Sequence, residues 1–169
     1  QARQQPERDY LMRDVARATS AAPTYFEPTQ VGEPPMTLVD GGVFANNPGM
    51  CAYVDRDTPG QPSEVTMISL GTGQLTRPLP YEKAKDWGLL GWAPRVLDVV
   101  FDGMSDTVDH QLQTLIGTEY VRLQTELDVA KDDIDDASEE NIEDLETEAR
   151  QLIADSEQEL SGLCAKLTA

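Results

Sequence analysis

The chain has 169 residues and a mass of 18.6 kDa, the size of one domain with a substantial core. Its 13 basic and 31 acidic residues give a net charge of −18, which argues against electrostatic capture of nucleic acid or of an anionic membrane surface. No apolar run approaches the roughly 18 residues that span a bilayer, so we expect a soluble chain.

The first predicted elements lead to an aspartate. Residues 9–19 have a helical pattern that Pro23 ends, because the residue before a proline disfavours helix. The proline- and glycine-rich residues 27–35 predict a loop. Residues 36–39 form a short apolar run, which we interpret as a buried strand that carries Asp40 at its carboxyl end.

The middle of the chain alternates helices with strands. Residues 47–55 are expected to be helical with Pro48 at the first position, and 59–62 to form a turn. Residues 65–70 predict a second buried strand, followed by G-T-G at 71–73. The remaining elements are a long helix through 96–115 with a break near Gly103, and a strand at 120–123. This order predicts an α/β layered fold with a mostly parallel sheet, whose functional residues lie at the carboxyl ends of strands.

The last part of the chain is strongly acidic. Residues 128–159 hold 14 acidic residues against Lys131 and Arg150, which is −12 of the total charge. Apolar residues recur there at spacings of three and four, which predicts an amphipathic helix that starts near a capping box formed by Asp136 and Glu139. We expect residues 1–127 to form one domain and 128–169 a helical segment packed on it, or a helix that binds a partner.

Asp40-Gly41-Gly42 is the first candidate site. A carboxylate at a strand end, followed by two glycines that allow close approach of the backbone, could hold a catalytic base in a tight turn. From these three residues alone an ordinary structural turn is the alternative.

Other candidate motifs are incomplete. G-T-G at 71–73 lacks the third glycine of a dinucleotide loop, since Thr76 stands there, and no P-loop lysine follows, so we expect a structural role for it. No serine has the G-x-S-x-G context of a nucleophile elbow. The single histidine, His110, falls on the long helix and is expected to be solvated rather than catalytic.

The chain offers no cysteine-based site, but one unusual aromatic segment. Cys51 and Cys164 lie far apart outside any metal-binding pattern, so we expect no metal, no cofactor and a reducing, cytoplasmic setting. Both tryptophans, Trp87 and Trp92, flank two leucines and two glycines in W-G-L-L-G-W at 87–92. We expect this segment to be buried, with peripheral lipid contact as the alternative.

Three segments taken together resemble a known family. They are A-R-A-T-S-A-A-P-T-Y-F at 16–26, V-D-G-G-V-F-A-N-N-P at 39–48 and I-S-L-G-T-G at 68–73. In this order they are similar to the C-terminal half of patatin-like phospholipases, particularly bacterial ones, and the resemblance covers nearly the whole chain.

The resemblance implies a three-layer α/β fold and lipid acyl ester hydrolysis by a Ser-Asp dyad. The aspartate of the D-G-G motif maps onto Asp40, with Gly41, Gly42, Asn46 and Asn47 supporting its turn. The serine elbow and the glycine-rich oxyanion loop of the family lie N-terminal to this region. Neither motif is present in these 169 residues, so both are expected in a missing N-terminal half, and the opening residues from Gln1 have no signal peptide pattern.

Two alternatives stay open at this point. The chain could be a non-catalytic fragment or a module whose acidic helix binds a partner. It could also belong to an acyltransferase of the same fold, because an acyl-enzyme can be resolved by an acceptor other than water. The sequence does not name the lipid headgroup, the acyl position or the oligomeric state.

Overall fold

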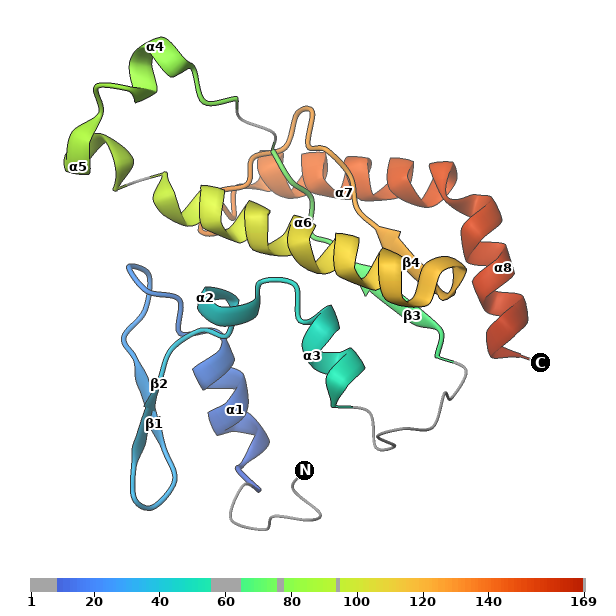
Figure 1. Cartoon of the computed structure of the whole chain (residues 1–169), viewed down its shortest axis with the longest axis horizontal. Coiled ribbons are helices and arrows are strands. Elements are labelled where there is room, and N and C mark those ends of the chain that lie inside the picture. Colours follow the sequence, from blue (N-terminus) through green and yellow to red (C-terminus); the bar gives the residue numbers. More distant parts are fainter. Residues whose placement is uncertain (1–8, 56–64, 76–77, 94, 169) are drawn as a thin grey trace. The chain divides into compact units, whose positions relative to one another are not determined.

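The computed structural model describes residues 9–55, 65–75, 78–93 and 95–168 (Figure 1). The chain divides into two compact units, unit 1 with residues 1–57 and 89–111, and unit 2 with residues 58–88 and 112–169. The predicted turn at 59–62 lies outside the described residues, and the domain boundary expected at 127/128 stays a prediction. The elements in chain order are α1 (Met12–Thr19), β1 (Thr29–Val31), β2 (Met36–Leu38), α2 (Gly42–Ala45), α3 (Gly49–Val54), β3 (Met67–Leu70), α4 (Tyr81–Ala84), α5 (Gly88–Trp92), α6 (Val96–Ile116), a 3₁₀ turn (Gly117–Glu119), β4 (Tyr120–Leu123), α7 (Glu139–Asp155) and α8 (Glu157–Leu167).

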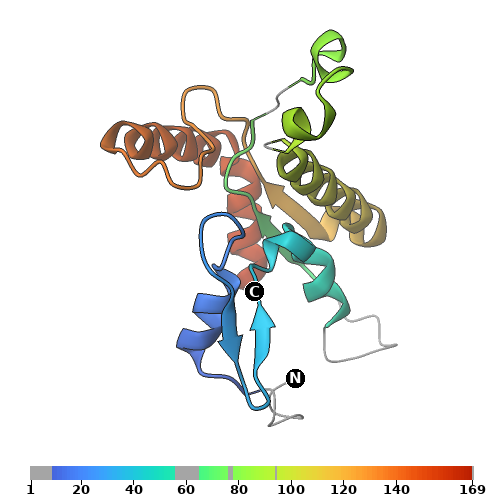
Figure 2. The same cartoon turned by 90° about the vertical axis from the view of Figure 1, so that its left-hand side faces the viewer.

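In unit 1, α1 packs beside a β-hairpin, as both cartoon views show (Figures 1 and 2). Strands β1 and β2 pair antiparallel from Thr29 opposite Leu38 to Val31 opposite Met36. The expectation of a loop throughout 27–35 is therefore wrong for β1. Its residues carry no strong strand pattern of their own, and the cross-strand hydrogen bonds of the hairpin decide their conformation.

The strand before Asp40 is more exposed than expected. Met36 is 43% exposed, because β2 belongs to a two-stranded sheet in the described part of the chain. Beyond Asp40, the helix predicted for 47–55 is confirmed as α3, with Pro48 as the residue before it rather than its first position.

In unit 2, β3 and β4 form a parallel pair. The register runs from Met67 opposite Tyr120 to Leu70 opposite Leu123, and a further parallel bridge joins Gln74 to Glu126. Tyr120 is buried but Leu70 is 72% exposed, so the expectation of a fully buried strand at 65–70 is wrong. In the residues that the structure describes, helices together with one parallel and one antiparallel pair of strands confirm the α/β class, consistent with part of the fold that the resemblance implies.

Helix α6 is continuous, and the break expected near Gly103 is wrong. A glycine inside a helix costs about 1 kcal/mol relative to alanine, which the surrounding turns tolerate here. Thr107 also donates its hydroxyl to the Gly103 carbonyl at 2.7 Å. His110 is exposed on this helix, as the sequence predicts.

The acidic C-terminal part forms two helices rather than one. Ser138, not Asp136, is the N-cap of α7: its Oγ accepts a hydrogen bond from Asn141 N at 3.3 Å, while Asp136 Oδ1 accepts one from Ser138 N at 3.1 Å. The capping box expected from Asp136 and Glu139 is therefore replaced by a serine cap two residues nearer the helix. Ser156 ends α7 and precedes α8, which buries Leu163.

Two polar side chains of α7 hold the loop before it. Glu148 Oε1 accepts hydrogen bonds from the backbone N–H groups of Asp128, Val129 and Ala130 at 2.9, 2.8 and 3.0 Å. The bond from Ala130, followed by those from Val129 and Asp128, lowers the pKa of Glu148 despite desolvation. Asn141, 3% exposed, accepts from Lys131 N at 2.7 Å and donates to the Asp136 carbonyl at 3.0 Å. The helix is thus anchored by polar contacts, whereas its predicted apolar stripe stays partly exposed, with Ile142 at 46% and Ile153 at 59%.

Candidate active site around Asp40

Backbone hydrogen bonding joins the first two motif segments. Asp40 follows β2 by two residues, and its N–H donates to the carbonyl of Ala21 at 3.0 Å. Ala21 is 1% exposed and lies two residues after the end of α1. The segment 16–26 therefore fixes the backbone position of Asp40, a contact between residues 19 positions apart that no local pattern indicates.

The carboxylate of Asp40 is held by its own turn. Its Oδ1 accepts a hydrogen bond from Gly42 N at 2.6 Å, and the side chain is half-buried. A Cβ on Gly42 would lie 3.1 Å from this oxygen, closer than an ordinary contact, and 3.6 Å from Asn46 Oδ1. Gly42 is thus needed for close approach, whereas a Cβ on Gly41 would meet Thr19 Oγ1 at an ordinary 3.9 Å. The arrangement fixes the orientation of a carboxylate group at the surface of unit 1.

The two asparagines of the motif have different environments. Asn47 is 5% exposed, and its Oδ1 accepts a hydrogen bond from Gly49 N at 3.0 Å, where α3 begins. Its Nδ2 is buried without a hydrogen-bond partner among the described residues. Asn46 is exposed at the end of α2. Asn47 therefore fixes the start of α3, while Asn46 lies beside the turn of Asp40.

A strained turn lies next to Ala21. Thr24 has φ of +76°, a conformation that is rare for a β-branched residue and costs on the order of 1–3 kcal/mol. It follows Pro23, and the N–H groups of Tyr25 and Phe26 both donate to the Ala22 carbonyl at 3.1 and 2.9 Å. Pro23 was the available signal for this turn, since proline favours its second position, but the positive φ could not be read from the sequence.

The G-T-G segment in unit 2 is explained by packing. A Cβ on Gly71 would lie 2.1 Å from Gln124 Oε1, and one on Gly73 would lie 2.4 Å from Leu127 Cδ2. Gln124 Oε1 also accepts from Gly73 N at 2.9 Å. Both glycines thus allow the chain after β3 to approach the chain after β4, in agreement with the structural role predicted for them.

The expectation that the segment 87–92 is buried is wrong for its two leucines. Leu89 and Leu90, on α5, are 85% and 90% exposed, Trp87 is half-buried and Trp92 is 36% exposed. The five-residue helix is too short to turn one face onto a core.

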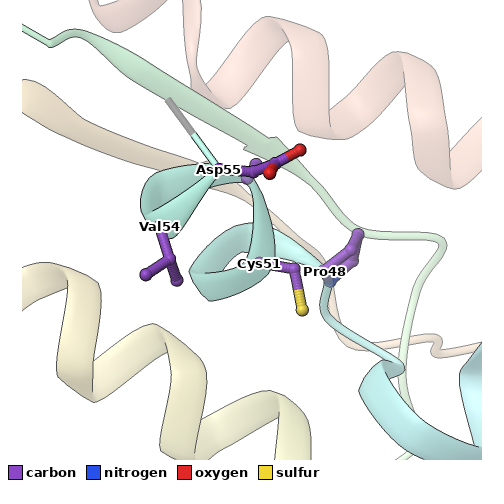
Figure 3. Close-up of a pocket in the computed structure, with 5 residues that line it drawn as sticks. Pro48, Cys51, Val54 and Asp55 are labelled. Atoms are coloured by element: carbon purple, nitrogen blue, oxygen red, sulfur yellow. The ribbon is translucent and has the colours of Figure 1, made fainter. Parts of the chain in front are cut away.

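The structure also has an open hollow along α3, of about 480 Å³ and lined by Pro48, Cys51, Ala52, Val54 and Asp55 (Figure 3). Asp40 is not among its lining residues.

Cys51 and Cys164 are exposed free thiols, and in the described residues no cluster of three or more His, Cys, Asp or Glu side chains could hold a metal ion. Nor does any helix of the described ranges have the length and apolar character to cross a membrane.

Comparisons with known proteins agree with the motif pattern. The family model described as patatin-like phospholipase matches residues 1–52, which include Asp40 and its turn. The chain is 36% identical over 138 residues to "Probable inactive patatin-like protein 9" of Arabidopsis thaliana, covering 73% of this chain and 36% of that protein. It is 33% identical over 180 residues to "Patatin-like protein 2" of Oryza sativa subsp. indica, covering 83% of this chain and 43% of that protein.

"Patatin-like protein 6" of Arabidopsis thaliana is 32% identical over 155 residues, covering 79% of this chain and 31% of that protein. The chain thus spans about a third to two fifths of the length of these plant relatives. No solved structure gives a significant match. The family-model match and the relatives together support a patatin-like family for this chain.

Proposed function

We propose that this chain is the aspartate-bearing part of a lipid acyl hydrolase, with Asp40 as the base of a Ser-Asp dyad. The observation that carries the proposal is the Asp40 carboxylate, oriented by the N–H of Gly42 at 2.6 Å in a motif that the patatin-like phospholipase model matches. A segment outside these 169 residues supplies the serine, since no G-x-S-x-G occurs here and the relatives are longer. Phospholipid or lysophospholipid esters are the substrate class.

In the first step the serine Oγ attacks the ester carbonyl carbon while Asp40 accepts the hydroxyl proton. A carboxylate is a weak base for a serine hydroxyl. Efficient proton transfer therefore depends on the precise position of the carboxylate beside the hydroxyl. The hydrogen bond from Gly42 leaves the second carboxylate oxygen as the natural proton acceptor. The tetrahedral intermediate then collapses, and the alcohol of the lipid leaves with the proton from Asp40.

In the second step water replaces the alcohol. Asp40 removes a proton from the water that attacks the acyl-enzyme and then returns it to the serine Oγ, so that the fatty acid and the free serine are released. Gly41 and Gly42 form the turn that presents the carboxylate, Asn46 lies beside that turn, and Asn47 fixes the helix that follows it. Oxyanion stabilisation comes from backbone N–H groups of the glycine-rich loop outside this chain, at about 3–4 kcal/mol per donor.

The test uses the polypeptide that joins this chain to a G-x-S-x-G segment. Asp40→Asn should lower hydrolysis of a short-chain p-nitrophenyl ester by about 10²–10⁴-fold and slow labelling of the serine by a fluorophosphonate. Asp98→Asn, an exposed aspartate on α6, is the matched control and should leave both rates unchanged. Equal rates for the Asp40→Asn protein and the parent would contradict the proposal. Release of a transferred ester rather than fatty acid would instead identify an acyltransferase.

A second candidate is a non-catalytic member of the family. It is favoured by the relative that is itself named "Probable inactive patatin-like protein 9" and is 36% identical to this chain. A folded full-length protein that hydrolyses no ester and takes up no fluorophosphonate would support this candidate over the enzyme.

A further inference from the structure

The segment 87–92 presents two neighbouring leucines to solvent. Leu89 and Leu90 are the most exposed of the large apolar side chains of the described residues, apart from Met12, at 85% and 90%. They lie on α5 between Gly88 and Gly91, and α5 buries none of its residues. Adjacent exposed leucines on a short helix are an unfavourable surface in water and indicate contact with an apolar phase.

Tryptophans flank these leucines on both sides. Trp87 is half-buried and Trp92 is 36% exposed, so each ring is divided between the protein and its surroundings. Tryptophan suits the boundary between water and the apolar part of a bilayer, because its ring is apolar and its N–H donates a hydrogen bond. Aromatic rings around an aliphatic tip are typical of segments that enter a lipid interface.

The charge around the segment differs in sign from the rest of the protein. Residues 78–95 hold three basic residues, Lys83, Lys85 and Arg95, against Glu82 and Asp86, a net charge of +1, in a chain of net −18. Residues 128–159 account for −12, so the overall charge does not describe this surface. Lys85 pairs with Glu82 and lies 5.8 Å from the Tyr81 ring centre, and Lys83 is exposed. A local positive charge favours approach to phosphate headgroups, where the chain as a whole would be repelled.

We propose that residues 87–92 form a lipid-surface contact, with Leu89 and Leu90 entering the acyl boundary and the two tryptophans at the headgroup level. This deepens the proposed function and rests on it, because it makes the substrate a lipid in an assembled surface rather than a single dispersed molecule. The bound area is that of one short helix, so the contact is peripheral and reversible.

The test is binding of the 169-residue chain to vesicles of phosphatidylcholine alone and of phosphatidylcholine mixed with phosphatidylglycerol. Both tryptophans of the chain lie in this segment, so intrinsic emission reports on it alone. We expect emission to shift to shorter wavelength, quenching by lipids brominated on the acyl chains, and tighter binding to the mixed vesicles. Leu89→Asn with Leu90→Asn should weaken binding by about 10-fold or more, since each loses several buried methyl or methylene groups.

The control is Ile153→Asn with Leu167→Asn, two exposed aliphatic residues of α7 and α8 at 59% and 73%, which should bind vesicles like the parent. Circular dichroism checks that every variant keeps its helices. The proposal is overturned if the folded parent shows no quenching by brominated lipid, or if the leucine variant binds as well as the parent. It is also overturned if the parent forms a dimer that the leucine variant dissolves and neither binds vesicles. Because binding needs no turnover, a failed Asp40→Asn test and a failed vesicle test are distinguishable.

Discussion

The Oδ1 atom of Asp40 lies 2.6 Å from the backbone nitrogen of Gly42, and a Cβ on Gly42 would come within 3.1 Å of the same oxygen. The second residue of the D-G-G motif therefore both donates to the carboxylate and leaves room for it. The first glycine has a different role, because the space beside Gly41 admits a methyl group.

Gly42→Ala should accordingly displace the Asp40 carboxylate, whereas Gly41→Ala should not. A hydrogen bond to a charged group contributes about 1.5–3 kcal/mol, so its loss should lower ester hydrolysis by the joined polypeptide about 10- to 100-fold. Steady-state kinetics of both variants measures the difference. If Gly41→Ala and Gly42→Ala lowered hydrolysis equally, the close contact between Gly42 and the Asp40 carboxylate would not explain the loss of activity.

Asn47→Ala should destabilise unit 1 more than Asn46→Ala. The first change removes the acceptor of the Gly49 N–H at the start of α3 from a position that is 5% exposed, which costs about 1–2 kcal/mol. The second changes an exposed side chain and should stay within about 0.5 kcal/mol. Urea unfolding gives both free energies, and a larger effect of Asn46→Ala would reverse the assignment.

Glu148→Ala should loosen the loop before α7. It leaves the N–H groups of Asp128, Val129 and Ala130 without their acceptor, so their hydrogen exchange should accelerate and the free energy of unfolding should fall by about 1.5–3 kcal/mol. Glu146→Ala is the control, since Glu146 pairs with Arg150 on the surface of the same helix at 3.0 Å. Unchanged exchange at 128–130 in the Glu148 variant would contradict the anchoring role.

Acid should weaken the ion pair between Lys131 and Asp136. The Lys131 ammonium, with further hydrogen bonds from Ser138, lowers the pKa of Asp136 from 3.8 to about 2. A lowered pKa in the folded state means that this stabilisation is complete above pH 3.8 and is lost as the pH falls through about 2.

NMR titration of the Asp136 carboxyl carbon measures this pKa. In Lys131→Met the midpoint should rise toward 3.8 without reaching it, because the bonds from Ser138 remain. Lys166→Met, which removes the partner of Glu119, should leave the Asp136 midpoint in place. A parent midpoint at 3.8 would show that the pair does not persist in solution.

Gly103→Ala should stabilise α6 by about 0.5–1 kcal/mol. The space beside Gly103 is open and its backbone is helical, so alanine gains helix propensity without a clash. Gly117 also has open space but a φ of +54°, so Gly117→Ala should destabilise instead. Thermal melts measure the change in melting temperature of each variant, which should rise for Gly103→Ala and fall for Gly117→Ala. A rise for both variants would mean that alanine adopts the positive φ of residue 117 without strain.

Features that depend on local pattern or on short motifs could be predicted from the amino-acid sequence alone. The spacing of apolar residues predicted α6 and the helical C-terminal part, the run at 120–123 predicted β4, and D-G-G with its neighbours marked Asp40. Such features follow from period, composition and residue type within one turn or strand, which the sequence displays directly.

Features that depend on contacts between separate segments of the chain could be seen only in the folded structure. Three interactions join residues 5 to 20 positions apart: the pairing that makes Thr29–Val31 a strand, the bond that ties Asp40 to Ala21, and the three amides held by Glu148. The exposure of Leu70, Leu89 and Leu90 was likewise invisible in the sequence, where each reads as a core residue. Burial depends on which segments are brought against an apolar side chain, and local periodicity reports only that a side chain is apolar.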